Sequence, residues 1–257
     1  MGKAIAIFNQ KGGVGKTTTN INLAACLAMK GKQILIMDID PQGNTTSGVG
    51  ISKQDIEITM YEVLIDESID PYTAIRDTNI NNMKILPSSI RLAGGEIELV
   101  HLEGREHRLR NALKKIRDGY DYIFIDCPPS LGLLTINSLT AVDSVLVPIQ
   151  CEFYALEGVS QLVSTIDLVK QNLNPELEIQ GVILSMFDGR TNLSIQVVEE
   201  VKKYFKEKVY TTVIPRNVRL AEAPSYGMPI IEYDAKSAGA EAYMEFADEF
   251  LEAEGDI

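Results

Sequence analysis

Mainly apolar runs alternate with segments of helical character along most of this 257-residue chain. Runs bounded by polar or turn residues predict buried strands, and they occur at 4–8, 33–38, 83–87, 121–126, 144–149, 179–187 and 209–214. Helix-like spacing or composition predicts helices at 20–28, 59–64, 154–171 and 192–206, and a polar, mostly helical stretch at 92–118 that Gly104 interrupts. In the helix at 192–206 we expect an inward stripe of Leu193, Val197, Val201 and Tyr204.

The order of these elements predicts the fold class. Unbroken apolar runs are typical of parallel strands that are buried on both faces, because helices cover both sides of such a sheet. Strands that alternate with helices therefore predict an α/β fold, with a single doubly wound, mostly parallel sheet and helices on both faces. The chain has no internal repeat, linker or low-complexity segment, so we expect one domain over residues 1–257.

Composition is that of an ordinary globule, with 45% apolar and 23% charged residues. No apolar run approaches the roughly 18 residues that a membrane-spanning helix needs, and the chain opens on a predicted strand rather than a signal sequence. Its cysteines (Cys26, Cys127 and Cys151) are far apart and odd in number, which favours packing roles in a reducing compartment. We therefore expect a cytoplasmic protein without a membrane segment.

A glycine-rich turn between the first strand and the first helix indicates the chemistry. Such a turn directs backbone N–H groups at an anion beside a helix N-terminus. Lys16 matches the P-loop lysine that reaches β- and γ-phosphates, and Thr17 matches the hydroxyl ligand of Mg²⁺. The usual first glycine is missing, because Gln10 occupies its position, and Lys11 is an additional lysine. We predict that a nucleoside triphosphate is held by Lys11, Gly12, Gly13, Val14, Gly15, Lys16, Thr17 and Thr18.

Carboxylates end two of the predicted strands. Asp38 and Asp40 lie on one strand face, because side chains two residues apart in a strand point the same way. At the carboxyl edge of a parallel sheet they would lie near the phosphate loop, although an aspartate before proline also commonly caps a turn. Asp126 ends an apolar strand in the manner of a Walker B carboxylate, which usually holds Mg²⁺ through water. The loop after Asp126 is a candidate for a switch that orders around a γ-phosphate.

The net charge of −12 argues against a nucleic-acid partner, but the charge is unevenly distributed. Between residues 190 and 219, seven basic residues stand against three acidic ones, which gives a local charge of +4. Such an island suits contact with a polyanion. A solvated helix face with charge pairs is the simpler explanation on composition alone. The basic residues are Arg190, Lys202, Lys203, Lys206, Lys208, Arg216 and Arg219.

Several motifs carry a resemblance to a known family. Lys-Gly-Gly-Val-Gly-Lys-Thr-Thr at 11–18 resembles the deviant Walker A signature of the ParA/MinD class of P-loop ATPases, which includes the nitrogenase iron protein. Asp-Ile-Asp-Pro-Gln-Gly-Asn at 38–44 is similar to the Walker A′ box of that class, and Asp-Cys-Pro-Pro-Ser at 126–130 to its switch. The segment Ile-Pro-Arg-Asn-Val-Arg-Leu-Ala-Glu-Ala-Pro-Ser at 214–225 resembles chromosomally encoded ParA proteins of the Soj type.

This resemblance implies an ATPase that uses Mg²⁺ and forms an ATP-dependent sandwich homodimer. Lys11 would reach the phosphates bound by the partner subunit, and Gly12 would let the two loops approach. Asp40 would hold the attacking water, so that catalysis would rest on Lys11, Lys16 and Asp40. The resemblance also implies that Asp38 and Asp126 lie near the Mg²⁺ shell, and that the adenine is contacted by Pro215 and Asn217.

The same resemblance implies a role in chromosome or plasmid partitioning on the nucleoid. The dimer would bind non-specific double-stranded DNA, and a ParB-type partner would stimulate hydrolysis. Arg190 and Arg219 match positions in the basic patch of this group. The wider island adds further DNA-binding candidates, namely Lys202, Lys203, Lys206 and Arg216.

A MinD-like membrane-associated positioning ATPase is the alternative function. That class shares the loop but lies on lipid through a basic amphipathic helix, whereas residues 235–257 carry seven acidic side chains and one lysine. A nitrogenase-type electron carrier would need cysteines that converge on a cluster, and the three cysteines here lack that setting. A small-molecule synthetase of the same fold stays open, although nothing in the sequence marks a second substrate pocket.

Overall fold

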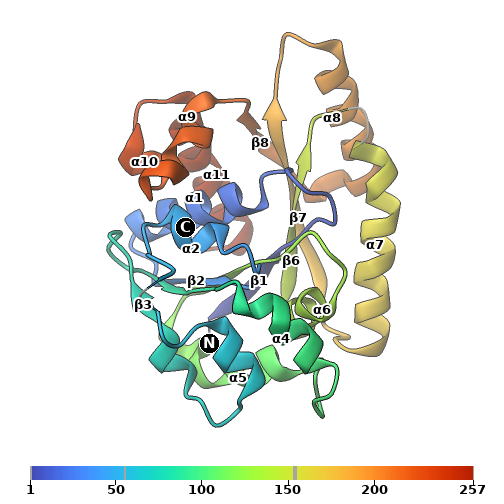
Figure 1. Cartoon of the computed structure of the whole chain (residues 1–257). Coiled ribbons are helices and arrows are strands. Elements are labelled where there is room, and N and C mark those ends of the chain that lie inside the picture. The colour runs from blue at the N-terminus through green and yellow to red at the C-terminus, as the bar shows by residue number, and fades with distance from the viewer. Residues whose placement is uncertain (1, 55, 153–154, 257) are drawn as a thin grey trace.

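The computed structural model describes residues 2–54, 56–152 and 155–256, and an eight-stranded sheet runs through its centre (Figure 1). The strand order is β3-β4-β2-β5-β1-β6-β7-β8, and all neighbours are parallel except β3, which runs antiparallel to β4 at one edge. This confirms the predicted α/β fold with a mostly parallel sheet. The strands are β1 (Lys3–Ile7), β2 (Ile34–Asp38), β3 (Arg76–Asp77), β4 (Met83–Leu86), β5 (Tyr122–Asp126), β6 (Ser144–Gln150), β7 (Glu178–Phe187) and β8 (Val209–Pro215).

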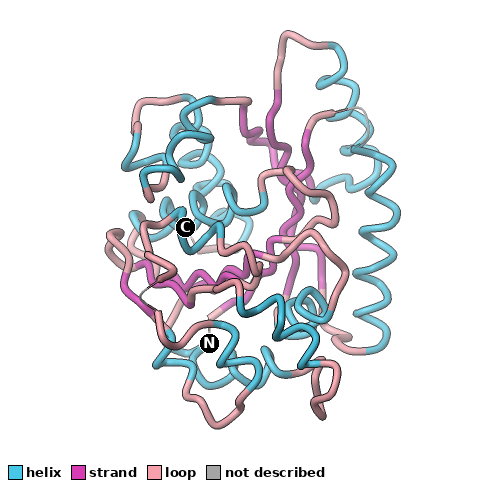
Figure 2. Tube along the Cα trace, in the orientation of Figure 1, coloured by secondary structure: helices cyan, strands magenta, loops and turns pink. Residues whose placement is uncertain are grey.

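Helices cover both faces of this sheet (Figures 1 and 2). Alternate residues of β1 enter different cores: Ile5 and Ile7 pack with α1 and α11, and Ala4 and Ala6 with α3 to α8. This burial on both faces explains why the strands read as continuous apolar runs. The helices are α1 (Lys16–Met29), α2 (Asn44–Gly48), α3 (Met60–Ile65), α4 (Arg91–Leu99), α5 (Arg108–Ile116), α6 (Leu133–Ala141), α7 (Ala155–Asn172), α8 (Asn192–Phe205), α9 (Val218–Glu222), α10 (Ile230–Tyr233) and α11 (Ala238–Glu254).

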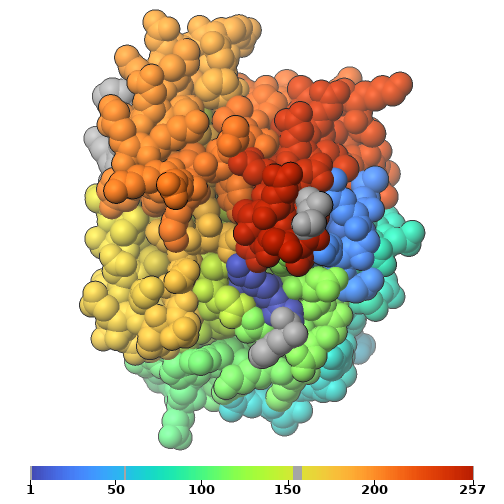
Figure 3. Space-filling model, turned by 180° about the vertical axis from the view of Figure 1, so that it is seen from behind, coloured from blue at the N-terminus to red at the C-terminus, as the bar shows by residue number. Residues whose placement is uncertain are grey.

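The start of β1 and the end of α11 lie side by side on the face that Figure 3 shows. Lys3 Nζ forms an ion pair with Glu254 Oε1 at 2.8 Å, which joins two segments from opposite ends of the sequence. In α11, Tyr243, Phe246 and Phe250 are buried against the sheet. None of the helices within the described ranges combines the length and the apolarity that crossing a membrane requires.

Each predicted strand segment overlaps an observed strand, and its ends differ by at most one residue from those of the strand. The break in the helical stretch at Gly104 is confirmed, since Gly104 adopts a φ of 62° between α4 and α5. The helix predicted at 20–28 begins earlier, at Lys16. The predicted helix start at residue 154 lies outside the described residues, and α7 is described from Ala155. The pattern of apolar and polar positions did not predict β3, α2, α6, α9, α10 or the 17-residue helix α11.

The buried stripe of α8 differs from the prediction. Val197 and Val201 are buried as expected, but Leu193 and Tyr204 are 38% and 51% exposed, so their predicted inward orientation was wrong. Ser194 and Phe205 are buried instead. The true stripe is therefore shifted by one residue at each end, and Ser194 tolerates burial because its Oγ donates to the Cys151 carbonyl at 3.5 Å.

Truncating the two adjacent aromatic residues at the end of α8 should have unequal effects on stability. Phe205→Ala should lower the free energy of unfolding by about 3 kcal/mol, because it empties a packed site in the core. Tyr204→Ala, the matched control on the exposed side, should cost about 1 kcal/mol or less. Urea denaturation followed by circular dichroism measures both losses. Equal losses would contradict the observed orientation of α8.

Candidate active site

The glycine-rich loop lies between β1 and α1, at the carboxyl edge of the sheet (Figure 1). Gly13 and Gly15 have φ values of 76° and 90°, in the left-handed region that favours glycine. Asn9 holds the loop at its base, because its Oδ1 accepts from Lys11 N at 3.0 Å and its Nδ2 donates to the Pro148 carbonyl at 2.8 Å. The loop is therefore fixed to the neighbouring strand β6 before α1 begins.

Lys16 opens α1 and is buried within the loop, with an exposed fraction of 8%. Its Nζ donates to the Lys11 carbonyl at 3.0 Å. Burial lowers the pKa of Lys16, and the nearby carboxylates Asp126 and Asp40 act in the opposite direction. The sequence-predicted lysine thus carries a charge that is partly removed from water. An anion bound in the loop would stabilise this charge.

Asp126 ends β5 and lies directly beside the loop. Its Oδ2 accepts hydrogen bonds from the Thr17 and Thr45 hydroxyls, both at 2.7 Å. Its Oδ1 is buried, and no described residue gives this atom a hydrogen bond. Burial raises the pKa of Asp126. A buried carboxylate oxygen without a partner, next to a threonine hydroxyl, fits the oxygen-rich surroundings that Mg²⁺ prefers.

No cluster of three or more histidine, cysteine, aspartate or glutamate side chains within the described ranges is placed to hold a metal by itself. This agrees with the way proteins bind Mg²⁺, which is usually held through one or two carboxylates together with water and substrate phosphates. Cys127 follows Asp126 but is buried, and burial raises the pKa of its thiol to about 12. The interpretation of Cys127 as a packing residue fits this environment.

Asp38 ends β2 and pairs in register with Asp126 on β5. Asp38 is fully buried, and its burial, together with the nearby charge of Asp126, raises its pKa. Its Oδ2 accepts from both the backbone N and the hydroxyl of Thr46 at 2.7 Å, and its Oδ1 accepts from Asp40 N at 3.2 Å. Its position near the Mg²⁺ shell stays a prediction, since these bonds go to Asp40 in the loop that follows β2 and to Thr46 in α2.

Asp40 lies in that loop and is partly exposed. Its Oδ1 accepts from Gln42 N at 2.9 Å, which fixes the direction of the carboxylate. No hydrogen bond to Oδ2 is found among the described residues, so this oxygen is available to a water molecule. The turn-capping contact therefore occupies only one oxygen of this carboxylate, so capping does not exclude the catalytic role that the sequence presented as its alternative.

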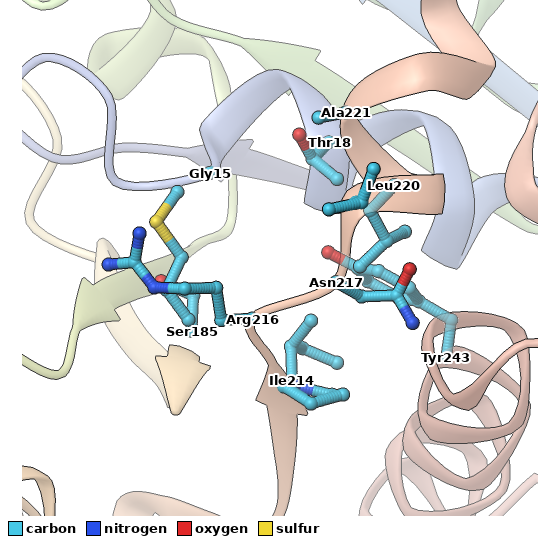
Figure 4. Close-up of a pocket in the computed structure, with 12 residues that line it drawn as sticks. Gly15, Thr18, Ser185, Ile214, Arg216, Asn217, Leu220, Ala221 and Tyr243 are labelled. Atoms are coloured by element: carbon cyan, nitrogen blue, oxygen red, sulfur yellow. The ribbon is translucent and has the colours of Figure 1, made fainter. Parts of the chain in front are cut away.

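A cavity of about 360 Å³ opens beside the start of α1 (Figure 4). Gly15 of the loop and Thr18 of α1 line this cavity, together with Pro215, which ends β8, and Asn217, which follows it. The structure thus brings the two adenine-contact candidates next to the glycine-rich loop, although about 200 residues separate them in sequence. Further lining residues are Ser185, Met186, Ile214, Arg216, Val218, Leu220, Ala221 and Tyr243.

Several of these lining residues were missed by the sequence analysis. Ser185 Oγ donates to the Val14 carbonyl at 2.8 Å and so holds the glycine-rich loop from β7. Tyr243, from α11, is buried and lies within 3.2 Å of the Thr19 hydroxyl. Neither residue belongs to a recognisable motif. Only the folding of β7 and α11 against α1 brings these side chains to the loop.

The three arginines of the predicted island are paired with carboxylates. Asp188 forms a bidentate pair with Arg190, with atoms 2.7 and 2.8 Å apart, and this arginine holds the pKa of Asp188 down at about 2. Arg216 lies 3.1 Å from Glu152, and Arg219 lies 2.9 Å from Glu222. Glu152, Asp188 and Glu222 fall outside the segment whose charge was counted. The local charge in space is therefore less positive than the sequence suggested.

The island also divides into two parts. Arg190, Arg216 and Arg219 lie near the carboxyl ends of β7 and β8, on the same edge of the sheet as the glycine-rich loop. Lys202, Lys203 and Lys206 lie at the far end of α8, which is 14 residues and therefore about 20 Å long. Lys203 pairs with Glu200. Of these six residues, Arg216 lines the cavity beside the glycine-rich loop.

Comparison with known proteins gives concordant matches. Residues 2–179 match the model of the AAA domain family. The chain is 62% identical to the sporulation initiation inhibitor protein Soj of Bacillus subtilis, over 97% of this chain and 98% of that protein. It is 54% identical to the chromosome partitioning protein ParA of Myxococcus xanthus, over 98% of this chain and 88% of that protein.

Solved structures share the fold over nearly the whole chain. Cobyrinic acid a,c-diamide synthase of Mycobacterium smegmatis, solved with ADP and magnesium, has 39% identity and a TM-score of 0.87, covering 99% of this chain and 96% of that one. The septum site-determining protein MinD of Pyrococcus horikoshii, complexed with Mg-ADP, has 27% identity and a TM-score of 0.83, covering 99% and 98%. Both structures are nucleotide complexes of the same architecture.

Proposed function

Since this chain belongs to the AAA domain family and, within it, to the ParA/Soj group of chromosome-partitioning ATPases, we propose that it is a single-domain, Mg²⁺-dependent ATPase that acts in partitioning as an ATP-switched, DNA-binding dimer. One observation carries the proposal. The 360 Å³ cavity opens onto Gly15 and Thr18, one residue away from the buried Lys16 and from Thr17, which contacts Asp126. A base pocket, a phosphate loop and a metal carboxylate are thus continuous.

ATP would place its adenine in the cavity, beside Pro215 and Asn217, and its phosphates over the loop from Lys11 to Thr18. A phosphate oxygen would replace the Lys11 carbonyl as the acceptor for Lys16 Nζ. The negative charge of the phosphates would compensate for the burial that lowers the pKa of Lys16. Backbone N–H groups of the loop supply the remaining donors.

Thr17 and Asp126 are the residues that would hold Mg²⁺, Thr17 through its hydroxyl and Asp126 through its unpartnered Oδ1, and Asp38 remains a predicted neighbour of this shell. When bound, the ion neutralises charge on the phosphate oxygens. Asp40 would hold the attacking water through Oδ2, while Gln42 N keeps the carboxylate oriented through Oδ1. The chain thus contributes position and positive charge, which phosphoryl transfer chiefly requires.

The dimer proposal rests on Lys11 and Gly12. Gly12 is exposed, its φ is not positive, and a Cβ at this position would meet nothing within 4 Å among the described residues. Neither backbone geometry nor packing within the chain therefore requires a glycine there. Close approach by a second copy would require it. In that arrangement Lys11 would reach the phosphates held by the partner subunit.

DNA binding is proposed for the dimer, with Arg190, Arg216 and Arg219 as the principal contacts and Lys202, Lys203 and Lys206 as outer ones. Dimerisation would double the number of basic side chains on one surface, which raises affinity for a polyanion in a salt-sensitive manner. Because the three arginines lie at the edge that holds the nucleotide, ATP could control the surface through dimerisation. Localisation would be cytoplasmic and nucleoid-associated, and a ParB-type partner would stimulate hydrolysis.

Retention on non-specific duplex DNA tests this function directly. We expect the protein to be retained with ATP and released with ADP or at high salt. Arg219→Ala should weaken retention about tenfold, because each dimer loses two charged contacts to phosphate. Arg91→Ala is the matched control, since Arg91 is an exposed arginine of α4 that pairs with Glu62 of α3. Retention that does not depend on ATP would contradict the switch.

Liposome flotation with ATP separates this function from the alternative of a membrane-associated, MinD-like ATPase. The fold similarity to MinD does not decide between them. In α11 the apolar side chains Tyr243, Phe246 and Phe250 are committed to the core, which leaves mainly acidic residues at the surface. Anionic vesicles should therefore recruit no protein, and ATP-dependent flotation would favour the membrane function.

A further inference from the structure

We propose that Thr46 and Ser88 are positioning residues for the catalytic carboxylate Asp40, and that buried Asp38 acts together with them by holding the backbone of Asp40, rather than only through the metal. This inference rests on the proposed ATPase function and concerns residues to which that function gives no role. Thr46 lies in α2 and Ser88 follows β4, so neither belongs to the glycine-rich loop. Both are fully buried, and both hydroxyls point into one hydrogen-bonded network.

The network holds the backbone of Asp40 from both sides. Asp38 Oδ1 accepts from Asp40 N at 3.2 Å, and the Ser88 hydroxyl donates to the Asp40 carbonyl at 2.7 Å. The same carbonyl also accepts from Gly43 N at 2.9 Å. The two peptide groups that flank the Asp40 Cα are thereby fixed. With the backbone fixed, the hydrogen bond from Gln42 N to Oδ1 sets the orientation of the Asp40 carboxylate.

Thr46 closes the network into a ring. Its backbone N and its hydroxyl both donate to Asp38 Oδ2 at 2.7 Å, which sets the plane of that carboxylate. Its hydroxyl oxygen accepts from Ser88 N at 2.9 Å, which sets the position of the Ser88 hydroxyl. One threonine therefore controls both contacts that hold Asp40. The two strands whose ends are involved, β2 and β4, are neighbours in the sheet, so the sheet itself fixes the spacing.

Such a ring would favour hydrolysis because it fixes Asp40, and Asp40 in turn fixes the position of the attacking water. Asp40 lies in a loop and is partly exposed, so its backbone has few packing contacts of its own. A misplacement of about 1 Å in a catalytic group can reduce the rate about 100-fold. Buried, fully paired hydroxyls are rigid, and they provide a fixed anchor for a group that must stay accessible to water. Thr46 and Ser88 do not need to contact ATP to do so.

Single-turnover hydrolysis of ATP, measured together with nucleotide affinity, tests the proposal. Thr46→Val removes the hydroxyl at nearly constant volume, and we expect the hydrolysis rate to fall about 10- to 100-fold. The dissociation constant of a fluorescent ADP analogue should change less than about twofold, because the glycine-rich loop is untouched. Thr46→Ser keeps the hydroxyl and should restore most of the rate. Ser88→Ala removes only the contact to the Asp40 carbonyl and should give an intermediate loss.

Ser47→Ala is the matched control. Ser47 is exposed in the same helix, and its hydroxyl donates to the backbone carbonyls of Gly43 and Asn44, outside the network that holds Asp40. It should hydrolyse ATP like the unmodified protein. A normal rate for both Thr46→Val and Ser88→Ala would overturn the inference, and so would a loss of nucleotide affinity in parallel with the rate. If Thr46→Val does not fold, Ser88→Ala alone decides. Absence of hydrolysis by the unmodified protein would instead overturn the ATPase function itself.

Discussion

An Asp40→Ala variant should bind ATP normally, hydrolyse it at least about 100-fold more slowly, and remain on DNA after the unmodified protein has been released. The physical reason is that Asp40 Oδ2 is the carboxylate oxygen free to hold the attacking water, and a positioned base or water-holding group contributes about 10²- to 10⁴-fold. The glycine-rich loop and the cavity do not depend on this side chain. Binding and dimerisation should therefore survive.

Phosphate release and DNA retention after an ATP chase measure the two halves of this expectation. Asp77→Ala is a suitable control, because Asp77 is an exposed aspartate in β3, paired only with Lys84 and away from the glycine-rich loop. The control should release DNA at the normal rate. Unchanged hydrolysis by Asp40→Ala would remove Asp40 from its catalytic role. Slow hydrolysis with normal release from DNA would separate hydrolysis from the DNA switch.

The second large effect concerns the two lysines of the loop, which should fail in different ways. Lys16→Ala should weaken ATP binding about 100-fold or more, because a buried charge that faces the phosphates is lost where the dielectric constant is low. Lys11→Ala should leave nucleotide binding by the monomer within about threefold, since Lys11 would serve the partner subunit. The same variant should abolish ATP-dependent dimerisation, and with it DNA retention.

Equilibrium binding of a fluorescent nucleotide and sedimentation with ATP distinguish these two outcomes. Each lysine is the other's control, because both changes remove one positive charge from the same loop. Equal losses of nucleotide affinity would indicate that Lys11 acts within its own subunit and would contradict the proposed dimer. A Lys16→Ala protein that still binds ATP tightly would contradict the assignment of the loop itself.

Much of the candidate site was predictable, because its parts directly follow strands that are recognisable in the sequence as continuous apolar runs. The runs that became β1, β2 and β5 end at the glycine-rich loop, Asp38 and Asp126, and parallel pairing brings those ends together at one edge. The inward face of α8 was predicted incorrectly at Leu193 and Tyr204. Its spacing permits two stripes one residue apart, and burial of Ser194 depends on a carbonyl from another element.

The surface proposed to bind DNA illustrates a different limit of sequence reasoning. A count over residues 190–219 treats charge as local, yet Arg216 pairs with Glu152, which comes from the end of β6. Arg219 likewise lies 3.4 Å from Asp234. Electrostatic interactions act over distances in space, so the net charge near each arginine could not be read from its neighbours in the chain.

The sequence by itself determined the seven parallel strands and the main helices between them, the phosphate loop with its two lysines, and the carboxylates at the strand ends. These features depend on local periodicity and on residues within a few positions of one another. Only the tertiary structure decided that Ser185, Tyr243 and the segment after β8 meet the loop around one cavity, and that Thr46 and Ser88 hold Asp40. Those contacts join residues that are far apart in the chain. Each of these residues stands alone in the sequence, without a motif or a periodic spacing, so its contact could not be predicted before the sheet had placed it.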